Sequence, residues 1–150
     1  MKTLKVLTAL IFATILVSCS NDDDGNNDTI LSENEIPSQI LSYVSEHFPD
    51  NSIIKTIKDN DDNTTSYDVY LEGNFELEFN SNYEITDIDG TTKLPDSVIP
   101  QDILDYVGQN YADQYITDWE LELTYQQIEL NNGIELEFAM DGTFMRIDND

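Results

Sequence analysis

Two segments of the chain carry apolar residues at the spacing of an amphipathic helix. Pro37 opens the first segment and Pro100 opens the second. Proline suits the first helical position because its missing N–H needs no partner there. The apolar stripes are Ile40, Leu41, Val44 and Phe48 in the first segment and Ile103, Leu104, Val107 and Tyr111 in the second. This pattern predicts two short helices, each with one buried face.

After each helix, apolar and polar residues alternate, as in strands that bury one face of a sheet. The expected strands are 53–58, 66–72, 75–80 and 84–89 after the first helix, and 134–139 and 144–148 after the second. Segment 118–130 contains no turn signal, but its apolar parity changes between Tyr125 and Ile128. Such a change indicates a turn or a bulge near Tyr125 to Gln127, and the corresponding segment of the first half favours a hairpin there.

The two halves of this pattern are similar in sequence. Residues 36–53 align without a gap to 99–116, with 8 of 18 positions identical, and residues 71–89 align to 130–148. Self-similarity of this kind is typical of tandem repeats. The fold class expected is α+β, with two repeats at 35–92 and 93–150, each a helix packed on an antiparallel sheet of about four strands. Units of this size are marginally stable alone, so we expect them to share a core or pack side by side.

The repeated motifs resemble the PepSY-like family. They are the helix starts "IPSQILSYV" and "IPQDILDYV", followed by "LEGNFELEF" and "LNNGIELEF". The resemblance implies a helix on an antiparallel sheet, present twice, with an architecture related to the beta-lactamase inhibitor proteins. In those related inhibitors, partners dock on the exposed sheet surface. The chain departs from the family pattern at Ala112, at the Asn82–Tyr83 turn, and at Ile85 and Phe144, where a tryptophan is expected.

The N-terminus has the features of an export signal. Lys2 and Lys5 precede a 12-residue apolar stretch at 6–17, which is shorter than the about 20 residues that span a bilayer. The "LVSC" that follows resembles the lipobox of bacterial lipoproteins, which implies that residues 1–18 are removed and that Cys19 is lipidated. Cys19 is the single cysteine of the chain, so it has no disulfide partner within it. A plain signal peptide with an unmodified or buried cysteine is the alternative.

Residues 19–34 are polar and acidic, and they predict a disordered tether between the lipid anchor and the folded part. The acids at 22–24 resemble the short export signal of lipoproteins displayed on the outer face of the outer membrane. This resemblance implies lipid anchoring at the cell surface, with the periplasmic side of the membrane as the alternative.

The charge of the chain restricts its partners. The sequence contains 31 Asp and Glu against 6 Lys and Arg, a net charge of −25. Such a charge argues against binding to nucleic acid or anionic lipid headgroups, because phosphate contacts need basic side chains. It favours cationic partners, divalent cations or simple solubility.

Residues suited to catalysis are few. His47 is the one histidine, and its position near a helix end indicates an ordinary polar residue there. The sequence contains no phosphate-binding or nucleophile motif, and lipidation of Cys19 would leave no thiol. We therefore expect a protein without enzymatic activity, and we assign no catalytic, cofactor-binding or metal-binding residue.

The strand parity places a row of acids on the exposed face of the sheet. The residues selected as a candidate partner-binding face are Tyr70, Glu76, Glu78, Glu120, Glu122, Glu135 and Glu137, and Glu129 shares their parity. Like charges on neighbouring strands repel, so an acidic face that is retained despite this cost suggests a basic protein partner, whose inhibition is one open outcome. The alternatives are calcium or another divalent cation, with "DNDDN" at 59–63 contributing, a glycan, or a solvated face without a partner.

Overall fold

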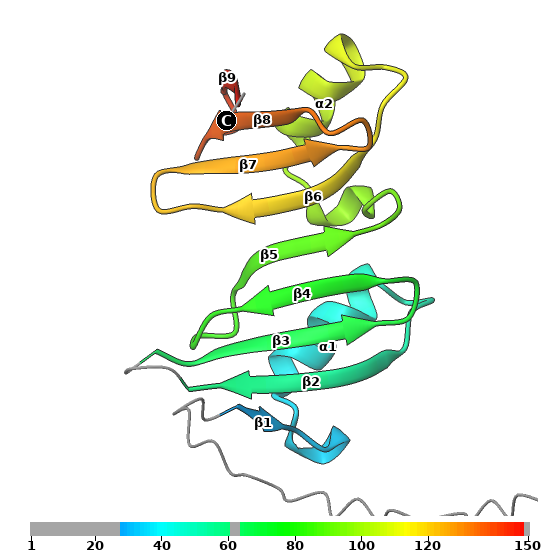
Figure 1. Ribbon diagram of the computed structural model, residues 1–150, viewed down its shortest axis with the longest axis vertical. Helices are drawn as coiled ribbons and strands as arrows, with labels where there is room; N and C mark the ends of the chain where they lie inside the picture. The colour runs from blue at the N-terminus through cyan, green and yellow to red at the C-terminus, as the bar shows by residue number, and fades with distance from the viewer. Residues whose placement is uncertain (1–27, 61–63, 149–150) are drawn as a thin grey trace, which may run out of the picture.

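A computed structural model of the protein describes residues 28–60 and 64–148. The described residues form two α-helices, two short 3₁₀ turns and a sheet of nine strands (Figure 1). The N-terminal half contains β1 (Thr29–Ile30), η1 (Glu33–Glu35), α1 (Ser38–His47), β2 (Ile53–Asp59), β3 (Ser66–Leu71), β4 (Phe75–Phe79) and β5 (Ile85–Gly90). The C-terminal half contains η2 (Asp96–Val98), α2 (Gln101–Asn110), β6 (Ile116–Leu121), β7 (Tyr125–Leu130), β8 (Glu135–Ala139) and β9 (Phe144–Asp148).

The sheet is an antiparallel meander in which every strand pairs with its neighbours in sequence, in the order β1 to β9. Both helices lie behind the sheet in Figure 1, so one sheet face is covered and the other faces solvent. The two halves join where β5 pairs with β6, through a register in which Ile88 lies opposite Trp119. This arrangement makes one continuous sheet across the whole fold.

The two helices begin in the same way. Pro37 and Pro100 have the same backbone angles, φ −55° and ψ 137°, and each precedes its helix as the N-cap rather than occupying the first helical position as predicted. The carbonyl of Pro37 accepts a hydrogen bond from the N–H of Leu41 at 3.2 Å, and that of Pro100 accepts one from Leu104 at 3.1 Å. Each helix then ends at a tenth residue, His47 or Asn110.

One apolar core lies between the helices and the sheet. From α1 the core receives Ile40 and Val44, and from α2 it receives Ile103 and Val107. The strands contribute the alternate residues that sequence parity predicted, all fully buried: Val69, Leu77, Phe79, Ile88, Ile128, Leu130, Leu136 and Phe138. The buried residues of both halves belong to one cluster, so burial of this apolar surface stabilises both halves together.

The predicted pair of four-stranded sheets is wrong in one respect. Four strands follow each helix, but all of them belong to a single sheet of nine. The additional strand is β1, the first in chain order, and it lies in the segment predicted as a disordered tether at 19–34. Thr29 pairs with Lys58, and the Leu31 N–H donates to the Thr56 carbonyl at 2.9 Å. Residues 1–27, including Cys19, lie outside the described part of the chain.

The hairpin predicted within 118–130 is present, but its turn is displaced. The turn lies between Leu121 and Tyr125, where the Glu122 N–H donates to the Tyr125 carbonyl at 3.0 Å. Leu123, which continued the apolar pattern, sits in this turn with 98% of its surface exposed. The parity changes across this turn, since Gln126, Ile128 and Leu130 are the buried positions of β7. Leu123 and Tyr125 continued the earlier apolar phase in the sequence, and this displaced the predicted turn.

Candidate functional site

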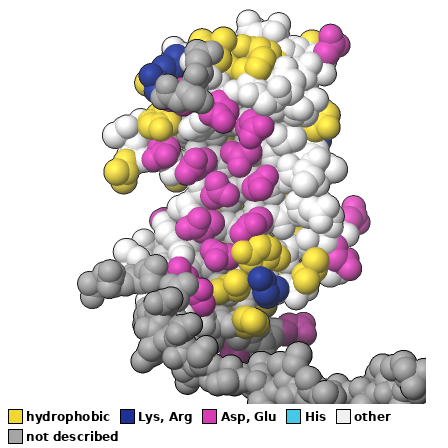
Figure 2. Space-filling model, viewed as in Figure 1, with side chains coloured by type: hydrophobic (Ala, Val, Ile, Leu, Met, Phe, Trp, Pro, Cys, Tyr) yellow, Lys and Arg dark blue, Asp and Glu magenta, His cyan; other side chains and the backbone are white. Residues whose placement is uncertain are grey.

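The solvent-facing side of the sheet carries a continuous row of carboxylates. The pleat alternates side chains between the two faces, so the residues between the buried positions of each strand point away from the helices. Nine acids take these positions on six consecutive strands, and we call them the acidic ladder: Asp68 (β3), Glu76 and Glu78 (β4), Asp87 and Asp89 (β5), Asp118 and Glu120 (β6), Glu129 (β7) and Glu135 (β8). Figure 2 shows this row as a column of Asp and Glu side chains down the face.

The register sets carboxylates directly opposite one another. Asp87 lies opposite Glu78 on one side and Glu120 on the other. Asp118 lies opposite Asp89 and Glu129 in the same way. Side chains in such cross-strand pairs stand about 5 Å apart at the Cβ atoms. The ladder is therefore densest at the junction of β5 and β6, where the two halves of the protein meet.

Burial and mutual repulsion raise the pKa values of the central acids. Desolvation, with the charges of Glu120 and Glu78 added to it, raises the pKa of Asp87 to about 7. Desolvation, followed by the charges of Asp87 and Asp89, raises the pKa of Asp118 to about 7. The pKa values of Glu78, Asp68 and Glu120 are also raised, in each case first by desolvation. The centre of the ladder thus favours protons or an external positive charge.

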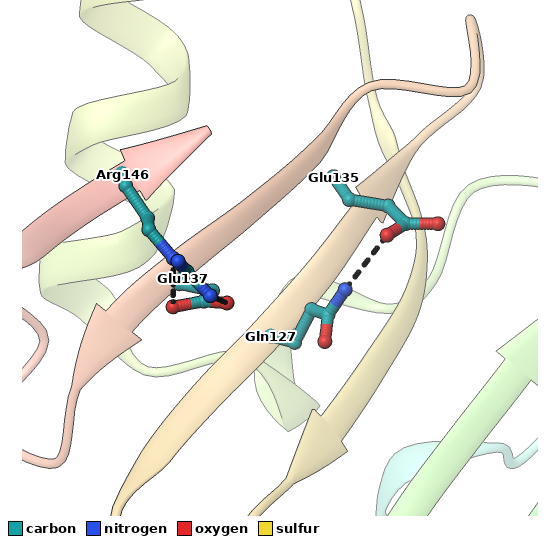
Figure 3. A network of polar contacts seen from close by, with 4 residues as sticks. All are labelled: Gln127, Glu135, Glu137 and Arg146. Carbon is teal, nitrogen blue, oxygen red and sulfur yellow. Dashed lines mark hydrogen bonds and ion pairs between the residues drawn. The ribbon is translucent and has the colours of Figure 1, made fainter. Parts of the chain in front are cut away.

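Two basic side chains stand at the ends of the ladder. Lys55 of β2 lies next to Tyr70, with its Nζ 4.1 Å from the centre of the ring. Arg146 of β9 lies opposite Glu137 of β8 and forms two hydrogen bonds with it, Nε to Oε2 at 2.8 Å and Nη2 to Oε1 at 2.6 Å (Figure 3). The ladder between these two ends is left with its negative charge.

Glu137 lies on the predicted face of the sheet, but it is not exposed as predicted. Its side chain is only 3% exposed and is covered by the Arg146 guanidinium. Strand parity gave the correct face, but it could not show that the neighbouring strand brings an arginine onto this carboxylate. Glu135, two residues earlier, stays on the ladder and accepts a hydrogen bond from Gln127 Nε2 at 2.9 Å (Figure 3).

The other selected residues lie on or beside the ladder. Glu76, Glu78, Glu120 and Glu135 belong to it, and Glu122 lies at its margin in the β6–β7 turn. The selection omitted Asp87, Asp89 and Asp118, which the structure places at its centre. The alternation Asp87–Ile88–Asp89 was the available signal, since each aspartate flanks a buried residue. Asp118 likewise precedes the buried Trp119.

A groove opens at the Tyr70 end of the ladder. Its volume is about 540 Å³, and its lining includes Ile54, Lys55, Tyr70, Asn74, Glu76 and Asp89. A hydrogen bond with Glu76, together with desolvation, raises the pKa of Tyr70 to about 12. Tyr70 lies opposite Glu76 across β3 and β4, and Ile54, 68% exposed, adds an apolar side chain to the lining. Tyr70 was selected from parity alone, and the groove beside it could not be read from the sequence.

Other candidate chemistry finds little support among the described residues. His47 ends α1, and its Nδ1 lies 3.0 Å from Ser97 Oγ, so it links the helix to η2 rather than to the ladder. Within 28–60 and 64–148, no group of three histidine, cysteine or acidic side chains is arranged to hold a metal ion. Residues 61–63 of the proposed "DNDDN" cation site lie outside that part. No helix in the same part is long and apolar enough to cross a membrane.

The chain matches a protein family over most of its length. A model of the family described as "Putative beta-lactamase-inhibitor-like, PepSY-like" matches residues 24–87 and again residues 65–146. The chain belongs to this PepSY-like family. The two matches overlap and together cover both halves of the sheet, as expected for a chain that carries the family motifs twice. No curated protein matches the chain.

Solved structures of similar proteins share the fold. One, from Bacteroides thetaiotaomicron, is described as a "putative calcium-regulated periplasmic protein"; it is 25% identical, with a TM-score of 0.77 over 81% of this chain and 97% of that one. A "putative periplasmic protein from DUF2874 family" from Bacteroides vulgatus is 29% identical, with a TM-score of 0.75 over 87% and 100%. A further protein from Bacteroides vulgatus, described as a "putative periplasmic protein of unknown function", is 30% identical, with a TM-score of 0.76 over 81% and 99%.

Proposed function

We propose that this PepSY-like protein is a non-enzymatic binding module of the cell envelope, and that its acidic ladder binds a basic protein. The observation that carries the proposal is the register at the β5–β6 junction, where Asp87 faces both Glu78 and Glu120. Carboxylates placed opposite one another lower stability unless something positive neutralises them. A basic surface laid along the sheet would do so on all six strands together.

The shape and size of the ladder favour a protein over a single ion. Six neighbouring strands, about 4.8 Å apart, give the ladder a length of about 24 Å. A row of this length suits several lysine and arginine side chains of one partner. Complementary charge of this kind speeds association and selects partners. We infer that binding masks the partner's basic surface, and inhibition would follow where that surface is the partner's active region.

The proposal includes a lipid anchor. Cys19 would carry it, residues 19–28 would connect it to β1, and the similarity to periplasmic proteins supports export from the cytoplasm. We propose the outer face of the outer membrane as the location, with its periplasmic face as the alternative. Replacing Cys19 with Ala should release the protein from the membrane fraction, and protease added to intact cells should remove the wild-type domain. Protection of the domain in intact cells would place it inside.

The central experiment is capture of partners from native envelope extract with residues 20–150 as bait. The ladder variant changes Glu76, Glu78, Asp89, Glu120, Glu129 and Glu135 to their amides and spares the buried Glu137. The matched control makes the same number of amide changes at exposed acids on or beside the helices and in the N-terminal turn: Glu33, Glu46, Asp50, Asp102, Asp105 and Asp113. Both variants therefore have the same net charge.

The expected result is a basic protein retained by wild type and by the control variant, but lost with the ladder variant. Its retention should also weaken as salt is raised, because exposed charges are screened. Equal retention by all three baits would mean that any binding comes from net charge or from another surface. Retention by none of them would contradict the proposed function.

Calcium binding is a second candidate, favoured by the similar Bacteroides thetaiotaomicron protein described as calcium-regulated. Calcium prefers oxygen ligands, but within 28–60 and 64–148 no three acids of the chain are arranged to hold an ion. If calcium binds the folded chain, about 1 mM calcium raises the melting temperature, and a chelator reverses the effect. Magnesium at equal concentration is the control, because general screening by a divalent cation would raise the melting temperature with both ions.

A further inference from the structure

The groove at the end of the acidic ladder combines features that the rest of the ladder lacks. Here an aromatic ring, an exposed aliphatic side chain and two carboxylates line one hollow of about 540 Å³. Hollows of this volume are large enough for a small molecule or for a side chain with its flanking backbone. The groove lies where β3 and β4 join, and its carboxylates, Glu76 and Asp89, are themselves members of the ladder.

The groove already contains a positive charge supplied by the protein itself. Lys55 Nζ sits 4.1 Å from the centre of the Tyr70 ring, within the distance of a cation–π contact. Tyr70 of β3 lies opposite Glu76 of β4 in the sheet register, so the ring and the carboxylate lie side by side. This internal contact shows the kind of group that the groove accommodates, namely a cation on a flexible aliphatic stem.

We propose that the groove receives an arginine side chain of the basic partner and that Lys55 competes with it for Tyr70. Arginine suits the site better than lysine for a geometric reason. Its guanidinium is planar, so it stacks on a tyrosine ring while its N–H groups point outward to carboxylates. Glu76 and Asp89, which lie opposite each other on β4 and β5, supply those carboxylates. The proposal rests on the proposed function, because it specifies one anchor point of the same surface.

The test uses two fluorescent peptides of equal charge, nona-arginine and nona-lysine, titrated against residues 20–150 by fluorescence polarisation. We expect the arginine peptide to bind more tightly. Tyr70→Leu should weaken its binding about three- to tenfold, while Tyr70→Phe, which keeps the ring, should retain most of the affinity. The nona-lysine affinity should change less in both variants.

Lys55→Met provides the sharper test, because removal of a competitor should tighten binding. We expect the affinity for nona-arginine to rise about threefold or more. The control is Lys93→Met, which changes the net charge equally but removes an exposed lysine that is paired with Asp96 at 2.7 Å and does not line the groove. Lys93→Met should change the affinity less than about twofold, since it acts only through screened long-range charge.

The possible failures are distinguishable. If the peptides bind and the ladder variant abolishes binding, but the Tyr70 and Lys55 variants match wild type, the groove proposal is wrong and the proposed function stands. Equal effects of Lys55→Met and Lys93→Met would likewise reject Lys55 as a competitor. If neither peptide binds wild type at low salt, both the groove proposal and the proposed function are contradicted.

Discussion

At the scale of single residues, Glu137 and Arg146 form an ion pair on the outer sheet face in which the carboxylate is buried. Glu137 is 3% exposed, so it depends on Arg146 for both its hydrogen bonds and its charge balance. Removing one partner of a buried pair leaves an uncompensated charge. The pair lies at the β9 end of the ladder, and because its two charges neutralise each other, it adds no negative charge to the ladder.

Replacing Arg146 with Met should lower the free energy of unfolding by about 2 kcal/mol. The effect should be smaller than for a fully buried pair, because the Arg146 side chain is itself 63% exposed. Urea denaturation measures the change. A second substitution, Glu137→Gln, in the same chain should recover part of the loss, since it removes the unpaired charge. A loss that the second substitution leaves unchanged would show that the methionine disrupts packing instead.

Asp87 should make stability depend on pH. Its pKa is about 7 in the folded protein and about 4 in the unfolded chain. The folded state therefore binds the proton more tightly, and the stability gained from it is full below about pH 4 and is lost as the pH rises through about 7. The free energy of unfolding should therefore fall as the pH rises from about 5 to about 8.

Replacing Asp87 with Asn should reduce this dependence to the part that Asp118 contributes through its own pKa of about 7. It should also stabilise the protein at pH 8 by about 1 kcal/mol, a value reduced for solvent screening of a half-buried group. Asp113→Asn, in the exposed segment after α2, removes the same charge and is the control. Urea denaturation across the pH range gives both slopes. If the two variants have the same slope, the repulsion is spread over the whole chain and is not centred on Asp87.

The difference between Asp87 and the acids selected from sequence shows what parity can and cannot provide. Parity identified Glu76, Glu78 and Glu120 because each alternates with plainly apolar neighbours in a long strand. Asp87 and Asp118 are central because β5 and β6 pair, and that pairing joins strands on either side of an intervening helix. No local pattern specifies which strand ends meet, so the density of charge at the junction needed the structure.

At the scale of the elements, two glycines of the C-terminal half differ in whether the structure has room for a side chain. Gly142, in the β8–β9 turn, has φ +82°, and a Cβ there would lie 2.7 Å from Asp102 Cβ in α2. Gly108 lies inside α2, and a Cβ there would meet nothing within 4 Å. The turn is thus packed against the start of the helix, while the helix surface at Gly108 is open.

Gly142→Ala should therefore destabilise the protein by about 2 kcal/mol, through both backbone strain and the contact with Asp102. Gly108→Ala should stabilise it by about 0.5–1 kcal/mol, because alanine loses less conformational freedom in a helix. Thermal unfolding of the two variants measures both changes. If Gly142→Ala were neutral, the β8–β9 turn could not be packed as closely against α2 as the structure shows.

Helices and most strands were predictable because their signals are local. The apolar stripes gave both helices to within about one residue at their starts, and alternation gave the strand faces. The turn after β6 was misplaced because Leu123, an apolar residue, occupies an exposed turn position. Strand β1 was missed because its two residues form a strand only by pairing with β2, a contact made across the intervening helix.

At the scale of the whole molecule, the two halves share one core and one sheet. Neither half contains more than about 60 residues, a size at which a lone unit buries little of its surface. Trp119, the single tryptophan, lies in β6 and pairs across the junction with Ile88 of β5. Its fluorescence therefore reports on the C-terminal half and on the junction itself.

Leu77→Ala, a cavity-forming change at a fully buried position of β4, should lower the free energy of unfolding by about 3 kcal/mol. Because the halves share one core, we expect them to unfold together, so the loss should appear equally in Trp119 fluorescence and in far-ultraviolet circular dichroism. Wild-type protein, measured by both probes, is the reference. A variant whose fluorescence transition stays at the wild-type position would show that the C-terminal half unfolds separately.

The meander order of the sheet has a consequence for how the chain reaches this structure. Each strand hydrogen-bonds only with strands adjacent to it in sequence, so the loops that must close during folding are short, and the longest of them contain a helix. Chains dominated by such near-neighbour contacts fold quickly, because little entropy is lost before each contact forms. On the export that we propose, strands that emerge N-terminus first would add to the sheet one after another. The strongly charged β5–β6 junction would then form only once the first half of the sheet is in place to receive it.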